Sequence, residues 1–351
     1  MRPAPRGAAM SKRTWASILA KAMARNLAAA RRSTVSAAKR ATKRATNQAT
    51  KKAAKPATGA GDGVPGVSAG IAGRRRFRLY RPPGIGKDER LPLLVMLHGC
   101  GQDALGLAHS TRMNRVAARE RFLVLYPEQD RLANAQACWN WFDTASGRAF
   151  REVDAIMAVI HQVCLLHPVD GHRVAIAGMS AGASMAALVA TRHPSQFKSV
   201  AMHSGVPPGS AHSAVTALRA MQGRRAGLAH AVASLEPGVP WPPLLVIQGT
   251  TDPVVDHRNA DAAVRLWVDA AGAAAVLAGS ERRLQRGKRR AMTVQDFKLR
   301  GRTVATRVDV AQLGHAWSGG ASKQAFSDPL GPDASRMVWS FAARQFRAAG
   351  P

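Results

Sequence analysis

The chain has 351 residues, and 46% of them are hydrophobic, which is enough for one large folded domain and an additional tail. Its 51 Lys and Arg residues outnumber its 21 Asp and Glu residues, so the formal net charge is +30. This charge predicts attraction to polyanions and specifies no fold. Three cysteines are too few for a disulfide-stapled scaffold and lack metal-ligand spacing, and we expect neither a metal nor a cofactor. The absence of any run of about eighteen apolar residues argues against a transmembrane helix.

Residues 1–70 are expected to form a region separate from the folded domain, which we place at residues 71–348. Residues 1–60 hold fifteen Lys and Arg and no Asp or Glu. Their richness in Ala, Lys, Arg and Thr predicts a disordered or helical basic tail, and a Pro/Gly-rich linker follows from Pro56. The tail is either solvated without a specific partner or a non-specific contact to a polyanion such as DNA or a granule surface.

Strands and helices are expected to alternate through the folded domain. Residues 76–81 alternate between polar and apolar side chains, which predicts an early edge strand. Buried strands are expected at residues 91–97, 122–127, 174–177, 197–205 and 243–252, with helices at 114–121, 151–167 and 181–193. This alternation is typical of βαβ units, so the predicted fold class is α/β, with a mostly parallel sheet covered by helices on both faces.

Two segments interrupt this alternation. Residues 207–242 are bounded by prolines and are long enough to form helical cover near a site. Residues 292–299 and 303–310 flank Arg300-Gly301 and predict a β-hairpin. A basic cluster precedes the hairpin, consisting of Arg282, Arg283, Arg286, Lys288, Arg289 and Arg290. We interpret this cluster as a solvated loop, with a second polyanion contact as the alternative.

The sequence Gly178-Met-Ser-Ala-Gly182 lies between a predicted strand and an Ala-rich helix. This is the context of a Gly-x-Ser-x-Gly nucleophile elbow, in which a strained turn exposes the serine hydroxyl. A β-carbon at either flanking glycine would collide with the neighbouring strand or helix. Ser180 is therefore the candidate nucleophile.

An activated serine needs a base and a group that orients the base, which follow it in the order acid, then histidine, in hydrolases of this kind. Asp252 comes directly after a buried strand and is the preferred acid, with Asp256 as the other candidate. His315 lies in a Gly-flanked loop after the hairpin and is the candidate base. The loop that begins at His98 is expected to supply an oxyanion donor, the N–H of Cys100 or of Gly101, beside that of Ala181.

Seven motifs, in this order, together resemble the poly(3-hydroxybutyrate) depolymerase family of esterases, which is related to feruloyl and acetyl-xylan esterases. They are Leu97-His-Gly-Cys-Gly-Gln, Tyr126-Pro-Glu-Gln, Cys138-Trp-Asn-Trp-Phe, Gly178-Met-Ser-Ala-Gly, His203-Ser-Gly, Gly249-Thr-Thr-Asp and Gly314-His-Ala-Trp-Ser-Gly-Gly. The resemblance covers about residues 75–345. It implies an α/β-hydrolase fold and a triad of Ser180, Asp252 and His315, with an oxyanion donor at Cys100.

The resemblance also implies a substrate, which is a polyester such as poly(3-hydroxybutyrate), as granules or oligomers, or a short acyl ester. A feruloyl- or acetyl-type carbohydrate esterase with the same triad is the alternative. Trp139, Trp141 and Trp317 are expected to line an apolar groove for the polymer, or else to belong to the core. The resemblance further suggests that Cys100 and Cys138 could be bridged.

The start of the chain is a poor secretory signal, because Lys21 and Arg25 interrupt the short apolar run that begins at Trp15. Together with the basic tail, this resembles the intracellular branch of the family and predicts a cytoplasmic, granule-associated protein. A bridge between Cys100 and Cys138 would argue for the alternative, a secreted or periplasmic protein.

Deletion of residues 1–60 removes fifteen positive charges. It is expected to weaken binding to DNA or to polyester granules and to flatten the dependence of that binding on salt concentration. Retention on DNA over a range of NaCl concentrations measures this effect, and hydrolysis of a small soluble ester should be unchanged. An equal loss of binding and of hydrolysis would contradict this division of the chain.

Overall fold

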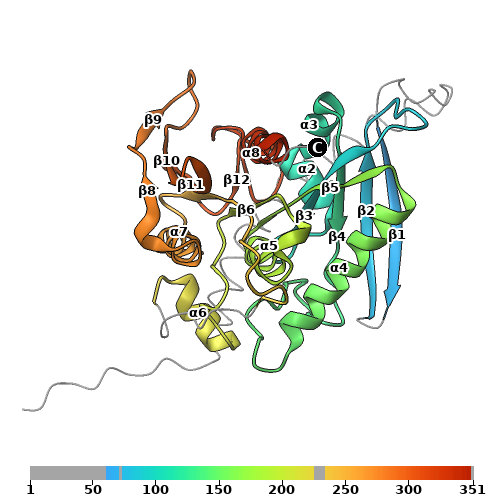
Figure 1. Cartoon of the computed structure of the whole chain (residues 1–351), viewed down its shortest axis with the longest axis horizontal. Helices are drawn as coiled ribbons and strands as arrows, with labels where there is room; N and C mark the ends of the chain where they lie inside the picture. The colour runs from blue at the N-terminus through green and yellow to red at the C-terminus, as the bar shows by residue number, and fades with distance from the viewer. Residues whose placement is uncertain (1–60, 71–72, 225–233, 349–351) are drawn as a thin grey trace, which may run out of the picture. The chain divides into compact units, whose positions relative to one another are not determined.

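The computed structural model describes residues 61–70, 73–224 and 234–348 (Figure 1). The basic tail expected at residues 1–60 lies outside the described residues. So do residues 225–233, which belong to the segment expected to give helical cover. The rest of that segment contains the helix α6 (Ala214–Met221). A capping box between Ser213 and Thr216 lies at its N-terminus.

The described residues contain an 11-stranded sheet with the order β1-β2-β4-β3-β5-β6-β7-β11-β10-β8, in which β9 also pairs with β10. Its strands are β1 (Asp62–Gly70), β2 (Gly73–Arg81), β3 (Leu91–Leu97), β4 (Leu123–Pro127), β5 (Val169–Met179), β6 (Ser199–His203), β7 (Leu244–Gly249), β8 (Val276–Ala278), β9 (Arg282–Leu284), β10 (Met292–Leu299) and β11 (Arg302–Val310). The consecutive pairs from β4 to β11 are parallel. Strands β3, β4, β6 and β7 are buried throughout, as continuous apolar runs predict for a covered parallel sheet.

Helices cover both faces of this sheet (Figure 1). The helices α4 (Arg148–Leu166), α5 (Ala181–Arg192) and α7 (Arg258–Ala270) pack on one face. The helices α2 (Ala104–Thr111), α3 (Met113–Glu120) and α8 (Ala334–Ala348) pack on the other face, where Phe122 stacks on Trp339. Along α4, residues such as Val153, Ile156 and Ile160 recur at helical spacing and are buried. The predicted α/β architecture is therefore confirmed.

The first strand of the sheet was missed by the sequence analysis. Strand β1 pairs antiparallel with β2 along its whole length, from Asp62 opposite Arg81 to Gly70 opposite Gly73. The predicted edge strand, β2, therefore lies between β1 and β4, and the folded part of the chain includes residues that we had assigned to the linker. Glycines and Pro65 hide the alternation of β1, and its pairing compensates for weak strand propensity.

The predicted β-hairpin is present as β10 and β11, which pair antiparallel across the turn at Arg300 and Gly301. Strand β11 also pairs in parallel with β7, so the hairpin extends the central sheet. The basic cluster differs from a plain loop, because Arg282 and Arg283 lie in β9 and pair with β10.

Strands β3, β5 and β7 end at neighbouring positions of one edge of the sheet, since parallel pairing brings Leu97 beside Gly178 and His203 beside both Met179 and Ile247. The loops that leave these carboxyl ends carry the candidate site residues. Within the described ranges, no helix has both the length and the apolar character that crossing a membrane requires.

Candidate active site

Ser180 lies in a sharp turn between β5 and α5, with φ of 56° and ψ of −124°. A β-carbon at Gly178 would come within 2.3 Å of the backbone of Gly182, and one at Gly182 would come within 2.2 Å of the Leu97 carbonyl oxygen. Both distances are far below van der Waals contact. Glycine at both positions therefore lets the turn pack against the end of β3, while the Ser180 N–H donates to the His203 carbonyl at 2.9 Å.

Three side chains from distant parts of the chain meet at this turn. His315 Nε2 lies 3.0 Å from Ser180 Oγ, and His315 Nδ1 lies 2.9 Å from Asp252 Oδ2. The side chain of Asp252 is fully buried and that of His315 is 7% exposed. With Nδ1–H donating to the carboxylate, Nε2 is free to accept the Ser180 proton.

Hydrogen-bond donors keep Asp252 ionised. The largest single influence on the pKa of Asp252 is burial, which raises it. The hydrogen bond and charge interaction with His315, together with two backbone donors, bring the net pKa below its ordinary value. The backbone donors are Val254 and Val255, each 2.9 Å from Oδ1. The carboxylate therefore stays ionised and can orient His315.

The other acid candidate, Asp256, is placed elsewhere. Its carboxylate forms a bidentate pair with Arg258, with distances of 2.9 and 2.8 Å, and the hydrogen bond from Arg258 is the main reason that the pKa of Asp256 falls to about 2. His315 already has Asp252 as its partner, and Asp256 forms a surface ion pair with Arg258 instead.

The loop after β3 lies against the nucleophile turn, since a β-carbon at Gly99 would stand 3.5 Å from Ser180 Cβ. The N–H of Gly101, the alternative oxyanion donor, donates to the Gln136 carbonyl at 2.9 Å and so already has an acceptor. Among the described residues, the N–H groups of Cys100 and Ala181 donate to no backbone or side-chain acceptor. These two donors remain the candidates for holding an oxyanion.

A disulfide joins Cys100 to Cys138 and so ties the loop after β3 to the aromatic segment that follows β4. The Trp139 indole N–H reinforces this link by donating to the His98 carbonyl at 3.0 Å. The third cysteine, Cys164, is a half-buried free thiol whose pKa is raised by burial.

Behind this disulfide lies a buried polar network that the sequence analysis did not find. The Glu152 carboxylate, 4% exposed, accepts from the Asn140 backbone at 2.8 Å, the Asn140 side chain at 2.6 Å and the Gln129 amide at 2.7 Å. Gln129 in turn accepts from Arg75 and donates to the Cys138 carbonyl. The motif residues Gln129 and Asn140 thus hold the aromatic segment in place. The position of Glu152 among the apolar residues of the core face of α4 is the sequence feature that could have indicated this network.

His203 is a second residue whose role only the structure shows. Its Nδ1 lies 3.1 Å from Ser204 Oγ, while its Nε2 accepts from the Ser318 N–H at 3.1 Å. The imidazole also stacks on Trp317. His203 therefore connects β6, beside the nucleophile turn, to the loop that carries His315, and it does so as a neutral ring.

All three tryptophans that were candidates for a groove belong to the core, which is the alternative to the predicted groove. Trp139 and Trp317 are fully buried, and the Trp317 indole N–H donates to Ser335 Oγ at 3.1 Å. Trp141, 7% exposed, also belongs to the core and contacts Phe142 edge-on. These side chains support the site loops from behind, because the indole N–H groups of Trp139 and Trp317 are hydrogen-bonded within the protein and no large ring surface faces solvent.

A buried metal site is not part of this arrangement. Across residues 61–70, 73–224 and 234–348, no three His, Cys, Asp or Glu side chains come together in a way that could hold a metal ion. The groups available to a substrate at the nucleophile turn are a hydroxyl, an imidazole and backbone N–H donors.

The fold and this arrangement of side chains define an α/β-hydrolase. Among solved structures, the model resembles acetyl xylan esterase from Aspergillus awamori, with a TM-score of 0.55 and 17% identity over 69% of this chain and 89% of that one. It also resembles the S-formylglutathione hydrolase FrmB from Staphylococcus aureus, with a TM-score of 0.50 and 13% identity over 84% of this chain and 100% of that one. At these identities the likeness concerns the fold.

The family follows from the sequence match. The model of the Esterase PHB depolymerase family matches residues 75–287, which is more than half of the chain. The chain therefore belongs to the Esterase PHB depolymerase family, as its motifs predict.

Curated relatives of two kinds match parts of the chain. Poly(3-hydroxyalkanoate) depolymerase C of Paucimonas lemoignei is 30% identical over 41% of this chain and 35% of its own length. Feruloyl esterase B of Neurospora crassa is 28% identical over 51% of this chain and 65% of its own length. Acetylxylan esterase of Coprinopsis cinerea is 28% identical over 54% of this chain and 53% of its own length. The chain spans less than two thirds of each of these relatives.

The disulfide leads to a stability prediction. Replacement of Cys138 by Ser opens a loop whose ends are 38 residues apart. It should lower the free energy of unfolding by roughly 4 kcal/mol, because the cross-link restricts the unfolded chain. Urea unfolding measures this difference, with Cys164→Ser as the matched control. If the two variants lose the same amount, the cross-link contributes nothing.

Two buried histidines lead to a prediction of how the free energy of unfolding depends on pH. Burial lowers the pKa of His98 to about 4 and that of His203 to about 3. Both rings are neutral in the folded chain and take up a proton when it unfolds below about pH 6.5, so stability is complete above that pH and falls as the pH approaches 4. Each histidine should contribute a slope of up to about 1.4 kcal/mol per pH unit.

Urea unfolding at pH 7, 6 and 5 measures this slope. In a folded His203→Gln variant, whose amide oxygen can still accept from Ser318, the slope should be less steep by up to about 1.4 kcal/mol per pH unit. A free energy of unfolding that stays constant from pH 7 to pH 5 would contradict the assignment of neutral rings.

Proposed function

We propose that the protein is a serine esterase that hydrolyses poly(3-hydroxybutyrate) or its oligomers through an acyl-enzyme. The observation that carries this proposal is the continuous hydrogen-bonded connection from Asp252 through His315 to Ser180 at the nucleophile turn. Membership of the Esterase PHB depolymerase family and the similarity to a poly(3-hydroxyalkanoate) depolymerase support the choice of substrate.

In the first half of the reaction, Ser180 Oγ attacks the ester carbonyl carbon while its proton moves to His315 Nε2. The imidazolium that forms is stabilised by the buried Asp252 carboxylate, which stays ionised. The tetrahedral intermediate then collapses, the ester C–O bond breaks, and His315 returns the proton to the departing alkoxide. The products are an alcohol end of the polymer and an acyl-Ser180.

In the second half, a water molecule attacks the acyl carbon and His315 accepts its proton. Collapse of this second intermediate breaks the bond between the acyl carbon and Ser180 Oγ, and His315 returns its proton to Oγ. A 3-hydroxyacid or an oligomer with a carboxylate end is released. The oxyanion of each intermediate accepts from the N–H groups of Cys100 and Ala181. Because the disulfide and the Trp139 hydrogen bond fix the loop of Cys100, this donor is positioned before substrate binds.

A carbohydrate esterase that removes feruloyl or acetyl groups is the second candidate. The similarity to Feruloyl esterase B and to an acetylxylan esterase favours it. The same three residues would perform the reaction, so the substrate groove alone separates the two candidates.

The disulfide also bears on the compartment. Stable disulfides persist in oxidising compartments. The Cys100–Cys138 bond therefore supports the secreted or periplasmic alternative over the cytoplasmic location that the basic tail suggests. Association of residues 1–60 with granules or DNA stays a prediction.

Acid release from amorphous poly(3-hydroxybutyrate) granules tests the proposal. Replacement of Ser180 by Ala should lower kcat by about a thousandfold or more, and Asp252→Asn by up to about ten-thousandfold, because the histidine tautomer is then wrong. Asp256→Asn is the matched control and should retain activity, since Asp256 pairs with Arg258.

The same proteins are then compared on p-nitrophenyl butyrate and on feruloyl and acetyl sugar esters. Serine-dependent acid release from granules is the expected result. If granules are untouched while sugar esters are cleaved, the carbohydrate esterase is correct. If Ser180→Ala retains turnover of every ester, the serine mechanism is wrong.

A further inference from the structure

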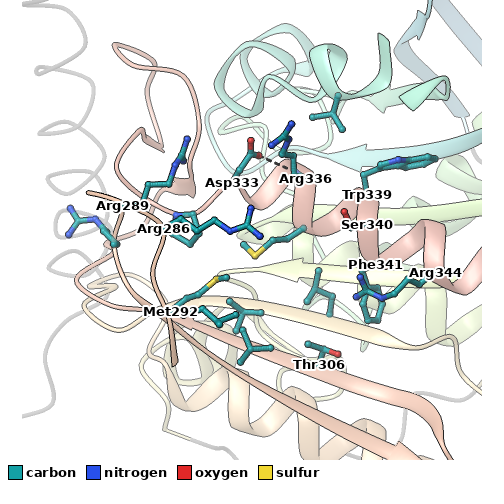
Figure 2. A pocket seen from close by; sticks show the side chains of 18 of the residues that line it. Arg286, Arg289, Met292, Thr306, Asp333, Arg336, Trp339, Ser340, Phe341 and Arg344 are labelled. Carbon is teal, nitrogen blue, oxygen red and sulfur yellow. Dashed lines mark hydrogen bonds between the residues drawn. The ribbon is translucent and has the colours of Figure 1, made fainter. Parts of the chain in front are cut away.

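A cleft of about 570 Å³ lies on the α8 face of the sheet (Figure 2). One wall comes from β9 and its connection to β10, and the other comes from α8 and the end of α3. Strands β7, β10 and β11 form its floor. None of Ser180, Asp252 and His315 lines this cleft, so it is distinct from the candidate active site.

Arginines dominate the charge of this cleft. Six line it, from both walls, and we call the site the arginine cleft: Arg119, Arg286, Arg289, Arg290, Arg336 and Arg344. Figure 2 shows side chains of the β9–β10 connection facing those of α8. Only two acids line it, Glu120 and Asp333, which leaves an excess of four positive charges.

These acids are already engaged. Glu120 pairs with Arg119 at 2.7 Å, and the Asp333 carboxylate accepts from the backbone N–H of Arg336 at 3.0 Å. Asp333 therefore caps α8 and leaves the Arg336 guanidinium without this partner.

The arginines differ in how they are held. Arg290 pairs with Asp328 at 2.8 Å, and Arg289 donates to the Gly331 carbonyl at 2.7 Å, so both are fixed to the segment before α8. The guanidinium groups of Arg286 and Arg336 form no hydrogen bond or ion pair with another described residue. These two groups, one on each wall, are available to a ligand.

Apolar side chains form part of the accessible lining of the arginine cleft. Leu284 at its rim is 43% exposed, and Met292 and Met337 are partly exposed. The guanidinium of Arg344 lies 5.7 Å from the centre of the Phe341 ring. An anion without an apolar part would leave these exposed apolar side chains in contact with water, and an extended polyanion would make little use of them.

We propose that the arginine cleft binds a single amphipathic organic anion, with a carboxylate or phosphate headgroup and a medium-length apolar chain. The headgroup lies between Arg286 and Arg336, where planar guanidinium groups offer paired donors to carboxylate or phosphate oxygens. The apolar chain covers Leu284, Met292 and Met337. The volume is within the range of ordinary small-molecule sites.

Calorimetric titration of the full chain with octanoate and with octyl phosphate, below the concentrations at which they aggregate, tests this proposal. Octyl glucoside serves as the uncharged probe, and inorganic phosphate as the headgroup alone. Octanoate or octyl phosphate should bind clearly more tightly than either control probe.

The Arg286→Gln/Arg336→Gln double variant should lose about tenfold or more of this affinity, because both charge-assisted contacts are removed. The matched control is Arg283→Gln/Arg347→Gln. It removes the same charge from β9 and α8, but these exposed residues do not line the cleft. It should change affinity less than twofold. Any octanoate that binds at the candidate active site should bind equally to the unmodified protein and to both double variants. Hydrolysis of a soluble ester should also be unchanged in both variants.

Four results would overturn the proposal. Equal losses in the two double variants would mean that only the net charge of the chain attracts the anion. Equal binding of octyl glucoside would mean that the arginines take no part, and equal binding of inorganic phosphate would mean that the exposed apolar side chains take none. Binding to anionic lipid vesicles without binding of monomeric octyl phosphate would assign the surface to a membrane.

Discussion

The close packing of the nucleophile turn against the end of β3 is the constraint on which the candidate site depends. The Leu97 carbonyl lies where a side chain at position 182 would begin, so only glycine permits this approach. The same contact brings the loop of Cys100 beside Ser180 and holds Ser180 in a backbone conformation that few residues adopt. The hydroxyl of the candidate nucleophile and the candidate oxyanion donor are thus positioned by one backbone contact.

Buried neutral and polar groups keep that contact rigid. His98 and His203 are uncharged rings. His98 accepts a hydrogen bond from the Gln129 backbone N–H, and His203 accepts one from the Ser318 backbone N–H, so each ring joins loops that leave different strands. The Glu152 carboxylate performs the same task for the aromatic segment around Asn140. Because an unsatisfied polar group in the interior is costly, these connections fix single positions for the loops.

The cluster of arginines and the candidate active site lie in different parts of the fold. The candidate active site contains a buried carboxylate and an imidazole at the carboxyl ends of β5, β6 and β7, whereas the arginine cleft lies against α8 on one face of the sheet. The +30 charge of the chain therefore includes a structured part, in addition to the residues of the tail.

The sequence by itself determined the parallel α/β sheet, the elbow at Ser180 and the candidate base His315, because these follow from local periodicity and from the fixed order of motifs along the chain. Only the tertiary structure decided between Asp252 and Asp256, since both follow the same strand and one alone reaches His315. It also revealed β1, whose pairing with β2 outweighs its weak propensity, and it placed Trp139 and Trp317 in the core. The arginine cleft likewise depends on the β9–β10 connection and α8 facing each other over one face of the sheet, and long-range packing of this kind leaves no periodic signal in a sequence.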